Sequence, residues 1–141
     1  MTAARMLAPA ALFCSLVGGC ARGGSAPAPT RWTQALVVEK LTTSGLNPVP
    51  KDTVRHPFLS VTGTVYDLSG SDLQIFIYGD EAHLKRDVSQ LDPVSVNPPT
   101  MMISWIAPPA LFTNGNLVAI LLTRDSALKQ AVKRALAASP E

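Results

Sequence analysis

The chain contains very little cysteine, and this scarcity limits both its redox chemistry and its catalytic options. Its 141 residues include two cysteines, Cys14 and Cys20. The remainder after Cys20 therefore has no thiol for an internal disulfide, a zinc–thiolate site or a cysteine nucleophile. A domain formed by this remainder must be stable through its core alone.

Other chemical signatures are absent as well. The chain has no Gly-x-Ser-x-Gly elbow, no phosphate-binding loop and no dinucleotide fingerprint. Its formal charge is +2, with 12 Lys and Arg against 10 Asp and Glu, and cations gather only in the last predicted helix. This pattern argues against the basic stripe typical of nucleic-acid binding, so we expect no nucleic-acid partner.

Metal and acid–base chemistry have little support. His83 and Asp87 have the i, i+4 spacing that places two ligands on one helix face, but no third ligand has a suggestive spacing. The carboxylate pairs, such as Asp80 with Glu81, fall at predicted turns and caps, where capping explains them. We therefore predict no cofactor, no metal site and no catalytic residue.

The N-terminal segment is apolar and lacks carboxylates until Glu39. Arg5 supplies a positive charge, and an almost wholly apolar run follows from Met6 to Val17. This run is too short to span a bilayer, which takes about 20 residues of helix. A cationic start, a short apolar core and small residues at the end are typical of a signal peptide, which we assign to residues 1–19.

The sequence Val17-Gly18-Gly19-Cys20 resembles the lipobox of bacterial prolipoproteins. The resemblance implies that a diacylglycerol is added to the Cys20 thiol, that the chain is cut before Cys20, and that the new amino group is acylated, typically with palmitate. Two alternatives are an ordinary secretory signal cut near Ala21 or Ala26, and a cytosolic protein with an apolar N-terminal helix. Pro9 and the two glycines disfavour that helix.

The mature chain divides into a tether and one domain. Residues 20–30 comprise the lipidated cysteine and a Gly/Ser/Ala/Pro segment that behaves as a flexible linker with a reach of roughly 15–20 Å. Residues 31–141 are long enough for a single domain. The lipoprotein resemblance implies an extracytoplasmic location in the cell envelope. Ala21, in place of the Asp that signals inner-membrane retention, favours the outer membrane if the organism has one.

The domain is predicted to be α+β. Val37 and Leu41 share a helix face, Gly45 and Leu46 fit a helix end, and Asn114-Gly115 is typical of a hairpin turn. We expect helices over 33–44, 80–92 and 126–138, and strands over 59–66, 73–78, 101–106 and 117–122. The order is helix, hairpin, helix, hairpin, helix. The simplest packing is a four-stranded antiparallel sheet with helices on one face and strand 117–122 in its interior.

The second face of this predicted sheet is the candidate binding site. If the helices cover the aliphatic side, Tyr66, Phe76 and Tyr78 point to the other side, and Trp105 can join them. The structural interpretation is that these aromatics stabilise the hairpin through cross-strand contacts, each of which contributes about 0.2–1 kcal/mol. The functional interpretation is a binding face, because clustered exposed aromatics mark contacts. The apolar, proline-stiffened segment 107–112 either covers the core or presents a contact edge.

A second resemblance covers most of the domain. The chain resembles a group of small, uncharacterised bacterial exported proteins in the segments Pro57-Phe58-Leu59-Ser60-Val61, Asp72-Leu73-Gln74-Ile75-Phe76 and Ser104-Trp105-Ile106-Ala107-Pro108-Pro109. This resemblance implies a single exported domain and carries no activity. We therefore expect a non-enzymatic envelope lipoprotein that binds a partner protein or envelope component. The alternatives are a small-ligand binding domain and an enzyme with an unrecognised carboxylate site.

Overall fold

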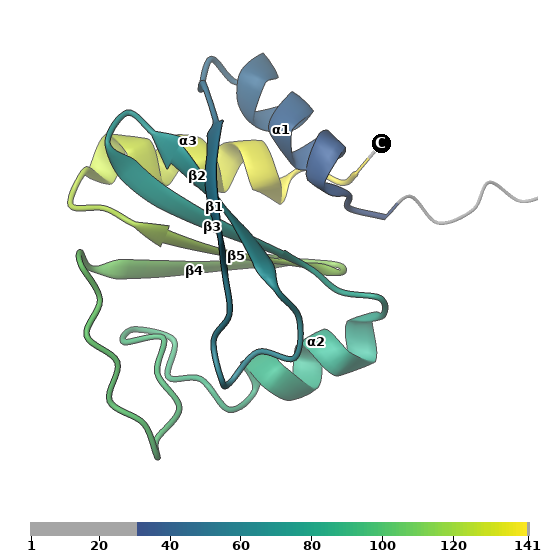
Figure 1. Ribbon diagram of the computed structural model, residues 1–141. Coiled ribbons are helices and arrows are strands. Elements are labelled where there is room, and N and C mark those ends of the chain that lie inside the picture. Colours follow the sequence, from purple (N-terminus) through teal and green to yellow (C-terminus); the bar gives the residue numbers. More distant parts are fainter. Residues whose placement is uncertain (1–30, 141) are drawn as a thin grey trace, which may run out of the picture.

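The structure, a computed structural model, describes residues 31–140, so the predicted signal peptide, lipobox and tether lie outside the described residues. It contains an antiparallel sheet with helices packed against it, which confirms the α+β class (Figure 1). The elements in chain order are α1 (Gln34–Thr43), β1 (Val49–Val54), β2 (Gly63–Leu68), β3 (Ser71–Ile77), α2 (Glu81–Val88), β4 (Pro109–Asn114), β5 (Leu117–Leu122) and α3 (Ser126–Ala137).

The ends of α1 and the start of α2 follow the local sequence closely, whereas α2 ends at Val88 and not at the predicted residue 92. Thr33 caps α1, and its side chain accepts a hydrogen bond from the Leu36 amide at 3.2 Å. Gly45 has φ +84°, and the Leu46 amide donates to the Leu41 carbonyl at 3.0 Å. This is the left-handed helix end that the sequence predicts. Asp80 likewise caps α2, as predicted, by accepting from the His83 amide.

The sheet has five strands in the order β1-β2-β3-β5-β4, so the prediction of four strands is wrong. The missed strand, β1, contains Pro50 and is largely exposed, and its pairing with β2 shifts register between Pro50 and Asp52. It therefore has no apolar alternation that a sequence pattern can detect. β5 is buried along its whole length and lies between β3 and β4, which confirms its predicted interior position.

The second hairpin is displaced along the chain from its predicted position. Residues 101–106, predicted as a strand, belong to the long connection between α2 and β4, and the strand is formed by Pro109–Asn114 instead. The pairing Asn114↔Leu117 leaves Gly115 and Asn116 as the two turn residues. Each residue of 109–114 pairs with a residue of β5, whereas most of 101–106 is exposed.

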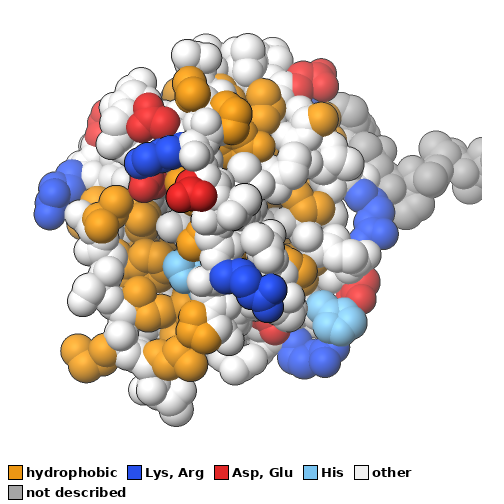
Figure 2. Space-filling model, in the orientation of Figure 1, with side chains coloured by type: hydrophobic (Ala, Val, Ile, Leu, Met, Phe, Trp, Pro, Cys, Tyr) orange, Lys and Arg blue, Asp and Glu red, His pale blue; other side chains and the backbone are white. Residues whose placement is uncertain are grey.

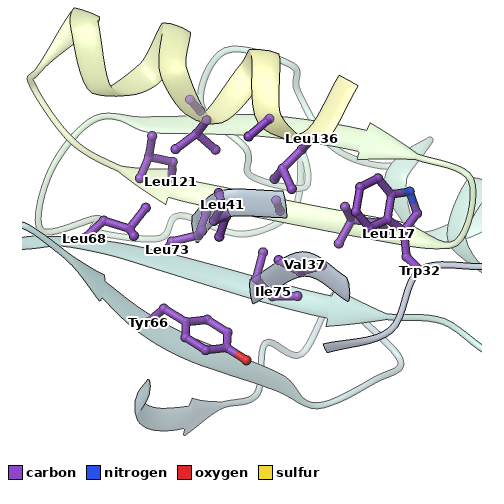
Figure 3. Close-up of a cluster of buried hydrophobic side chains, with 14 residues drawn as sticks. Trp32, Val37, Leu41, Tyr66, Leu68, Leu73, Ile75, Leu117, Leu121 and Leu136 are labelled. Atoms are coloured by element: carbon purple, nitrogen blue, oxygen red, sulfur yellow. The ribbon is translucent and has the colours of Figure 1, made fainter. Parts of the chain in front are cut away.

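One face of the sheet is covered by α1 and α3 (Figure 3). We call this the helical face. Its buried cluster consists of Trp32, Val37, Leu41, Tyr66, Leu68, Leu73, Ile75, Ala110, Leu117, Ala119, Leu121, Val132, Ala135 and Leu136. The apolar stripes predicted for the first and last helices therefore do face the sheet.

The opposite face is covered by α2 and two connecting segments, 55–62 and 89–108. We call this the loop face. Its buried cluster consists of Phe58, Leu59, Phe76, Tyr78, Leu84, Leu91, Val96, Val118, Ile120 and Leu122. Placing all helices on one face was therefore wrong, because Leu84 buries α2 against the other side of the sheet.

A buried asparagine joins the start of the domain to one end of the sheet. The Asn116 side chain is 6% exposed, and its Oδ1 accepts from the Trp32 amide at 2.8 Å. Its Nδ2 donates to the carbonyls of Trp32 and Tyr78, each at 3.1 Å. The chain therefore enters the domain at the end of the sheet where β4 turns into β5.

Candidate functional site

The four aromatic residues predicted to form a binding face do not lie together on an open surface. Tyr66 belongs to the helical-face cluster, and its hydroxyl donates to the Gln34 side chain on α1 at 3.0 Å. Phe76 and Tyr78 belong to the loop-face cluster, and Trp105 packs at its margin. Tyr66, Phe76 and Tyr78 are all buried. The expectation of a shared, open sheet face is therefore wrong.

The pairing register of the β2–β3 hairpin explains this separation. Tyr66 pairs with Leu73, and Thr64 pairs with Ile75. Paired residues in an antiparallel ladder point to the same face, so Tyr66 follows the aliphatic set of β3. Alternation was predicted correctly within residues 63–66 and within β3, although residues 59–62 of the predicted strand lie outside β2. The two strands were combined in the wrong phase. A shift of one residue in register moves every side chain to the other face.

A cluster of four rings, the aromatic cluster, forms at the margin of the loop face: His56, Phe58, Phe76 and Trp105. The His56 ring stacks on Phe58 at 4.9 Å between centroids and meets the Trp105 edge at 5.2 Å. His56 Nε2 lies 2.6 Å from Oε1 of the buried Gln74. This contact satisfies a polar side chain inside the core, which would otherwise destabilise the fold.

The later part of the connection between α2 and β4, residues 93–108, has no regular secondary structure but is held by specific bonds, and we call it the 93–108 loop. The Asp92 carboxylate accepts from the amides of Val94 and Ser95 at 2.9 and 2.7 Å. These amides hold the pKa of Asp92 below its usual value. The Trp105 indole N–H contacts the Ser95 carbonyl at 2.9 Å and Asn97 Oδ1 at 3.1 Å. The loop is therefore folded back on itself.

Exposed apolar side chains concentrate on this loop. Of the five large hydrophobic residues that are exposed within residues 31–140, four lie on it: Val94, Met101, Met102 and Ile106. Met102 is 101% exposed and Val94 is 80% exposed. Figure 2 shows hydrophobic side chains gathered over this region of the molecule. Contiguous exposed apolar surface is a feature of interaction sites in soluble domains.

A hollow of about 410 Å³ lies beside these residues. Its walls include Trp105, Ile103 and Pro108, with Arg124 as its one charged residue. The volume falls in the range of small-molecule sites, but such sites usually enclose most of the ligand, whereas this hollow is open to solvent. Its shape fits a side chain inserted from a partner better than an enclosed substrate.

The most connected carboxylate of the domain holds the loop face together. Asp87 Oδ2 accepts from the amide and hydroxyl of Ser60 at 2.8 and 2.7 Å, and from the Tyr78 hydroxyl at 2.8 Å. Burial opposes ionisation of Asp87, but these hydrogen bonds prevail and lower its pKa. Burial and the bond to Asp87 raise the pKa of Tyr78 well above its ordinary value. These three groups tie segment 55–62 to α2 and to the sheet.

The other candidate chemical groups have structural roles. His83, considered with Asp87 as a ligand pair, pairs instead with Asp80 at the start of α2. Asp125 caps α3 by accepting from the amides of Ala127 and Leu128. Across residues 31–140, no group of three or more His, Cys, Asp or Glu side chains is arranged to hold a metal. The predicted lipidation residue, Cys20, lies outside the described residues.

The chain matches no protein-family model, no curated protein and no solved structure. Its function must therefore be argued from its own residues.

Sequence reasoning missed the exposed part of the loop. Met101, Met102 and Ile106 were assigned to a strand, which would have buried alternate side chains. The signal against a strand was Pro98-Pro99, because a proline pair is typical of a turn, and the Met101 amide donates to the Pro98 carbonyl at 3.1 Å to close one. The sequence gives no signal for the stacking role of His56, because its aromatic neighbours are brought together only by the fold.

Proposed function

We propose that this protein is an exported lipoprotein, anchored through Cys20, whose domain binds a partner protein through the 93–108 loop. Support for the anchor is the lipobox sequence and the apolar run before it. The binding role is supported chiefly by four exposed apolar side chains on one loop, beside an open hollow. Within residues 31–140, no helix is long and apolar enough to cross a membrane.

The position of the loop favours a partner protein over the anchoring membrane. The chain enters the domain at Trp32, which is bonded to Asn116 at the turn between β4 and β5. The 93–108 loop joins the opposite end of β4, where Pro109 pairs with Leu122. A strand rises about 3.4 Å per residue, so these two ends are separated by roughly 17 Å. The loop therefore projects away from the end that receives the tether (Figure 1).

The anchor is tested by metabolic labelling with radioactive palmitate. Label should be incorporated into the wild-type chain and into a Cys14→Ser variant, because Cys14 leaves with the signal peptide. A Cys20→Ser variant should incorporate none. Labelling of the Cys20→Ser variant would refute the anchor without affecting the argument for the loop.

The contact surface is tested by photo-crosslinking in cells, with a benzophenone amino acid placed at Met102 or, as a control, at the exposed Glu39 on α1. We expect one protein adduct of constant mass from Met102 and none from Glu39. The adduct made from a third position, the exposed Met101, should disappear in a Met102→Ser/Ile106→Ser variant. It should persist in Val49→Ser, which removes an exposed apolar residue from β1. Lipid adducts, or equal adducts from Glu39, would contradict the proposal.

A small-ligand function is the second candidate, and the hollow beside Trp105 is the observation in its favour. A ligand bound there should raise the unfolding temperature, because binding to the folded state alone stabilises it. A Trp105→Ala variant should lose that rise. A thermal-shift screen of envelope-derived small molecules would test this candidate independently of the crosslinking.

A further inference from the structure

The sheet has two edges, and one of them is protected against further pairing. The edge strand β1 contains Pro50, Lys51 and Asp52, and its pairing with β2 is irregular at this point. Proline, charged residues and bulges are the devices by which proteins prevent another strand from adding to an edge. β1 is therefore a poor template for a further strand.

The other edge strand, β4, has little of this protection, since its one proline, Pro109, stands at its first position. Its residues Pro109–Asn114 include no charged side chain, and they pair with β5 in one continuous register. In the sheet formed by residues 31–140, β4 has β5 on one side and no strand on the other. A smooth, uncharged edge of this kind is a template for strand addition.

The register identifies the backbone groups that this edge presents. The Thr123 amide donates to the Pro108 carbonyl at 3.3 Å, so this facing pair is a hydrogen-bonded one. Hydrogen-bonded and non-hydrogen-bonded pairs alternate in an antiparallel ladder. The amides and carbonyls of Leu111 and Thr113 therefore point away from β5, toward the open edge. Pro109 also faces the open edge, so the N–H that it lacks would not have donated to β5.

A groove of about 560 Å³ runs along this edge. Five consecutive residues, 108–112, line it. Because successive side chains of a strand point to opposite faces, a groove that touches all five must follow the edge of the strand. Lys129, Gln130 and Lys133 of α3 form one wall, and Pro93 with Val94 forms the other.

The helical wall is positively charged and fixed in place. Lys129 and Lys133 are both exposed, and among residues 31–140 no carboxylate lines the groove. Asn114 Nδ2 at the end of β4 donates to the carbonyls of Leu136 and Ala138 at 2.8 and 3.1 Å. These bonds hold the C-terminal end of α3 beside β4, so the wall is present before any ligand binds.

We propose that the groove between β4 and α3 binds an extended, acidic segment of a partner protein, which adds to the sheet as a strand beside β4. Leu111 and Thr113 bond its backbone, and Lys129 and Lys133 pair with its Asp or Glu side chains. Alternate residues of the segment face the lysines, because side chains alternate along a strand. A second copy of this chain fits less well, since its β4 brings no carboxylate and its α3 brings the same two lysines.

The proposal is tested with a phage-displayed library of random dodecapeptides, selected on the purified full chain in detergent. We expect enriched peptides to carry acidic residues at alternate positions. The synthetic form of an enriched peptide should slow hydrogen exchange of the Leu111 and Thr113 amides at least about tenfold, because they gain hydrogen bonds. Absence of enrichment, or binding that leaves both amides unprotected, would overturn the proposal.

Variants separate the backbone contribution from the charge contribution. Thr113→Pro removes an outward amide at an exposed position and should weaken peptide binding about tenfold, as expected for a lost hydrogen bond. Lys133→Glu should weaken it about five- to tenfold, whereas Arg134→Glu, an equal charge change on α3 outside the groove, should not. If Lys133→Glu and Arg134→Glu had equal effects, the assignment of Lys133 to the charged wall of the groove would be wrong.

Pro93 and Val94 belong to both the groove and the 93–108 loop, so two further measurements separate this site from the rest of the loop surface and from a dimer. Met102→Ser/Ile106→Ser should leave peptide affinity unchanged, so failure of the loop proposal would not remove this site. Sedimentation of the full chain in detergent, with and without Thr113→Pro, detects the alternative occupant. A dimer that dissociates in the Thr113→Pro variant would show that β4 pairs with its own copy, which overturns the acidic-segment proposal.

Discussion

The two faces of the sheet bury clusters of similar character but are covered in different ways. On the helical face, α1 and α3 pack regular apolar stripes against the strands, and the side chains of Gln34, Tyr66 and Asn114 add hydrogen bonds between the layers. On the loop face, the short helix α2 is joined by two irregular segments that depend on particular polar contacts: His56–Gln74, Asp87 with Ser60 and Tyr78, and Trp105 with Ser95.

This difference has a functional consequence. A helix satisfies the hydrogen bonds of its own backbone. Its packing against a sheet therefore depends on the apolar area that it buries, and few hydrophobic residues remain exposed on its outer face. An irregular segment satisfies the hydrogen bonds of its backbone and side chains through individual contacts. Its remaining residues are free to contact a binding partner. Four of the five exposed large hydrophobic residues within residues 31–140 lie on the loop-face covering, and one of its segments also forms a wall of the β4 groove.

The largest effect is expected from the centre of the helical face. Leu41 is fully buried between α1 and the sheet, so Leu41→Ala should lower the free energy of unfolding by about 2–5 kcal/mol. Urea unfolding followed by circular dichroism measures this loss. Leu36→Ala, on the same helix and only partly buried, should cost less. Equal losses from the two variants would show that α1 is not packed as described.

A smaller global effect is expected where the loop face is tightest. A Cβ atom on Gly63 would lie 2.5 Å from the buried Phe76 ring, so Gly63→Ala should destabilise the domain by about 1–3 kcal/mol. Phe76→Leu should relieve part of this loss in the double variant. Gly79→Ala, where an added Cβ meets no atom within 4 Å, is the matched control and should change stability little. A neutral Gly63→Ala would refute the close approach.

The Asp87 contacts predict a pH dependence specific to the loop face. The lowered pKa of Asp87 means that its ionised form stabilises the folded state above the unfolded pKa of about 3.9. That stabilisation is lost as pH falls through the lower folded pKa. Asp87→Asn should lower stability near neutral pH by about 1–2 kcal/mol, because bonds to a charged group are lost.

Thermal unfolding between about pH 2.5 and pH 7 tests this linkage. The curve for Asp87→Asn should be flatter below about pH 4 than the wild-type curve. Glu39→Gln, at an exposed position on α1, serves as the control and should retain the wild-type slope. Parallel curves for wild type and Asp87→Asn would show that Asp87 is not held by Ser60 and Tyr78.

The smallest effect is expected at the margin of the loop face and should be local. Trp105→Phe keeps an aromatic ring but removes the N–H that contacts Ser95 and Asn97, at a cost of about 0.5–1.5 kcal/mol. Hydrogen exchange should accelerate within residues 93–108 while amides of α1 and α3 remain unchanged. Equal acceleration in both regions would contradict the independence of the two coverings.

The helical face was largely predictable because its signals are local. Thr33, Gly45 and Leu46 mark the ends of α1 within a few residues, and the stripe of Leu128, Val132 and Leu136 indicates which side of α3 is buried. The loop face was not predictable in the same way. Its ring contacts join His56, Phe76 and Trp105, which are far apart in the sequence, and no periodic pattern records such contacts.

The candidate sites likewise combine features that the local sequence predicts with features that depend on pairing between distant segments. Segment 107–112 was correctly recognised as apolar and stiffened by proline, with a contact edge as one of two interpretations. Its pairing with β5, which makes it an edge strand, depends on residues up to position 122. The prediction that Tyr66 and Phe76 share a face was wrong. Each strand has two alternating sets of side chains, and the pairing register decides which set of one strand shares a face with which set of the other.

The sequence by itself determined both ends of α1 and α3, the start of α2, the alternation within β2 and β3, the buried character of β5 and the absence of thiols after Cys20. Each of these follows from composition or from neighbours within about one or two turns of chain. The tertiary structure alone decided which face each alternating set covers, where α2 lies, and that 109–114 forms an open edge beside two lysines. These depend on pairings between distant segments, whose free energy is realised only when the whole sheet forms.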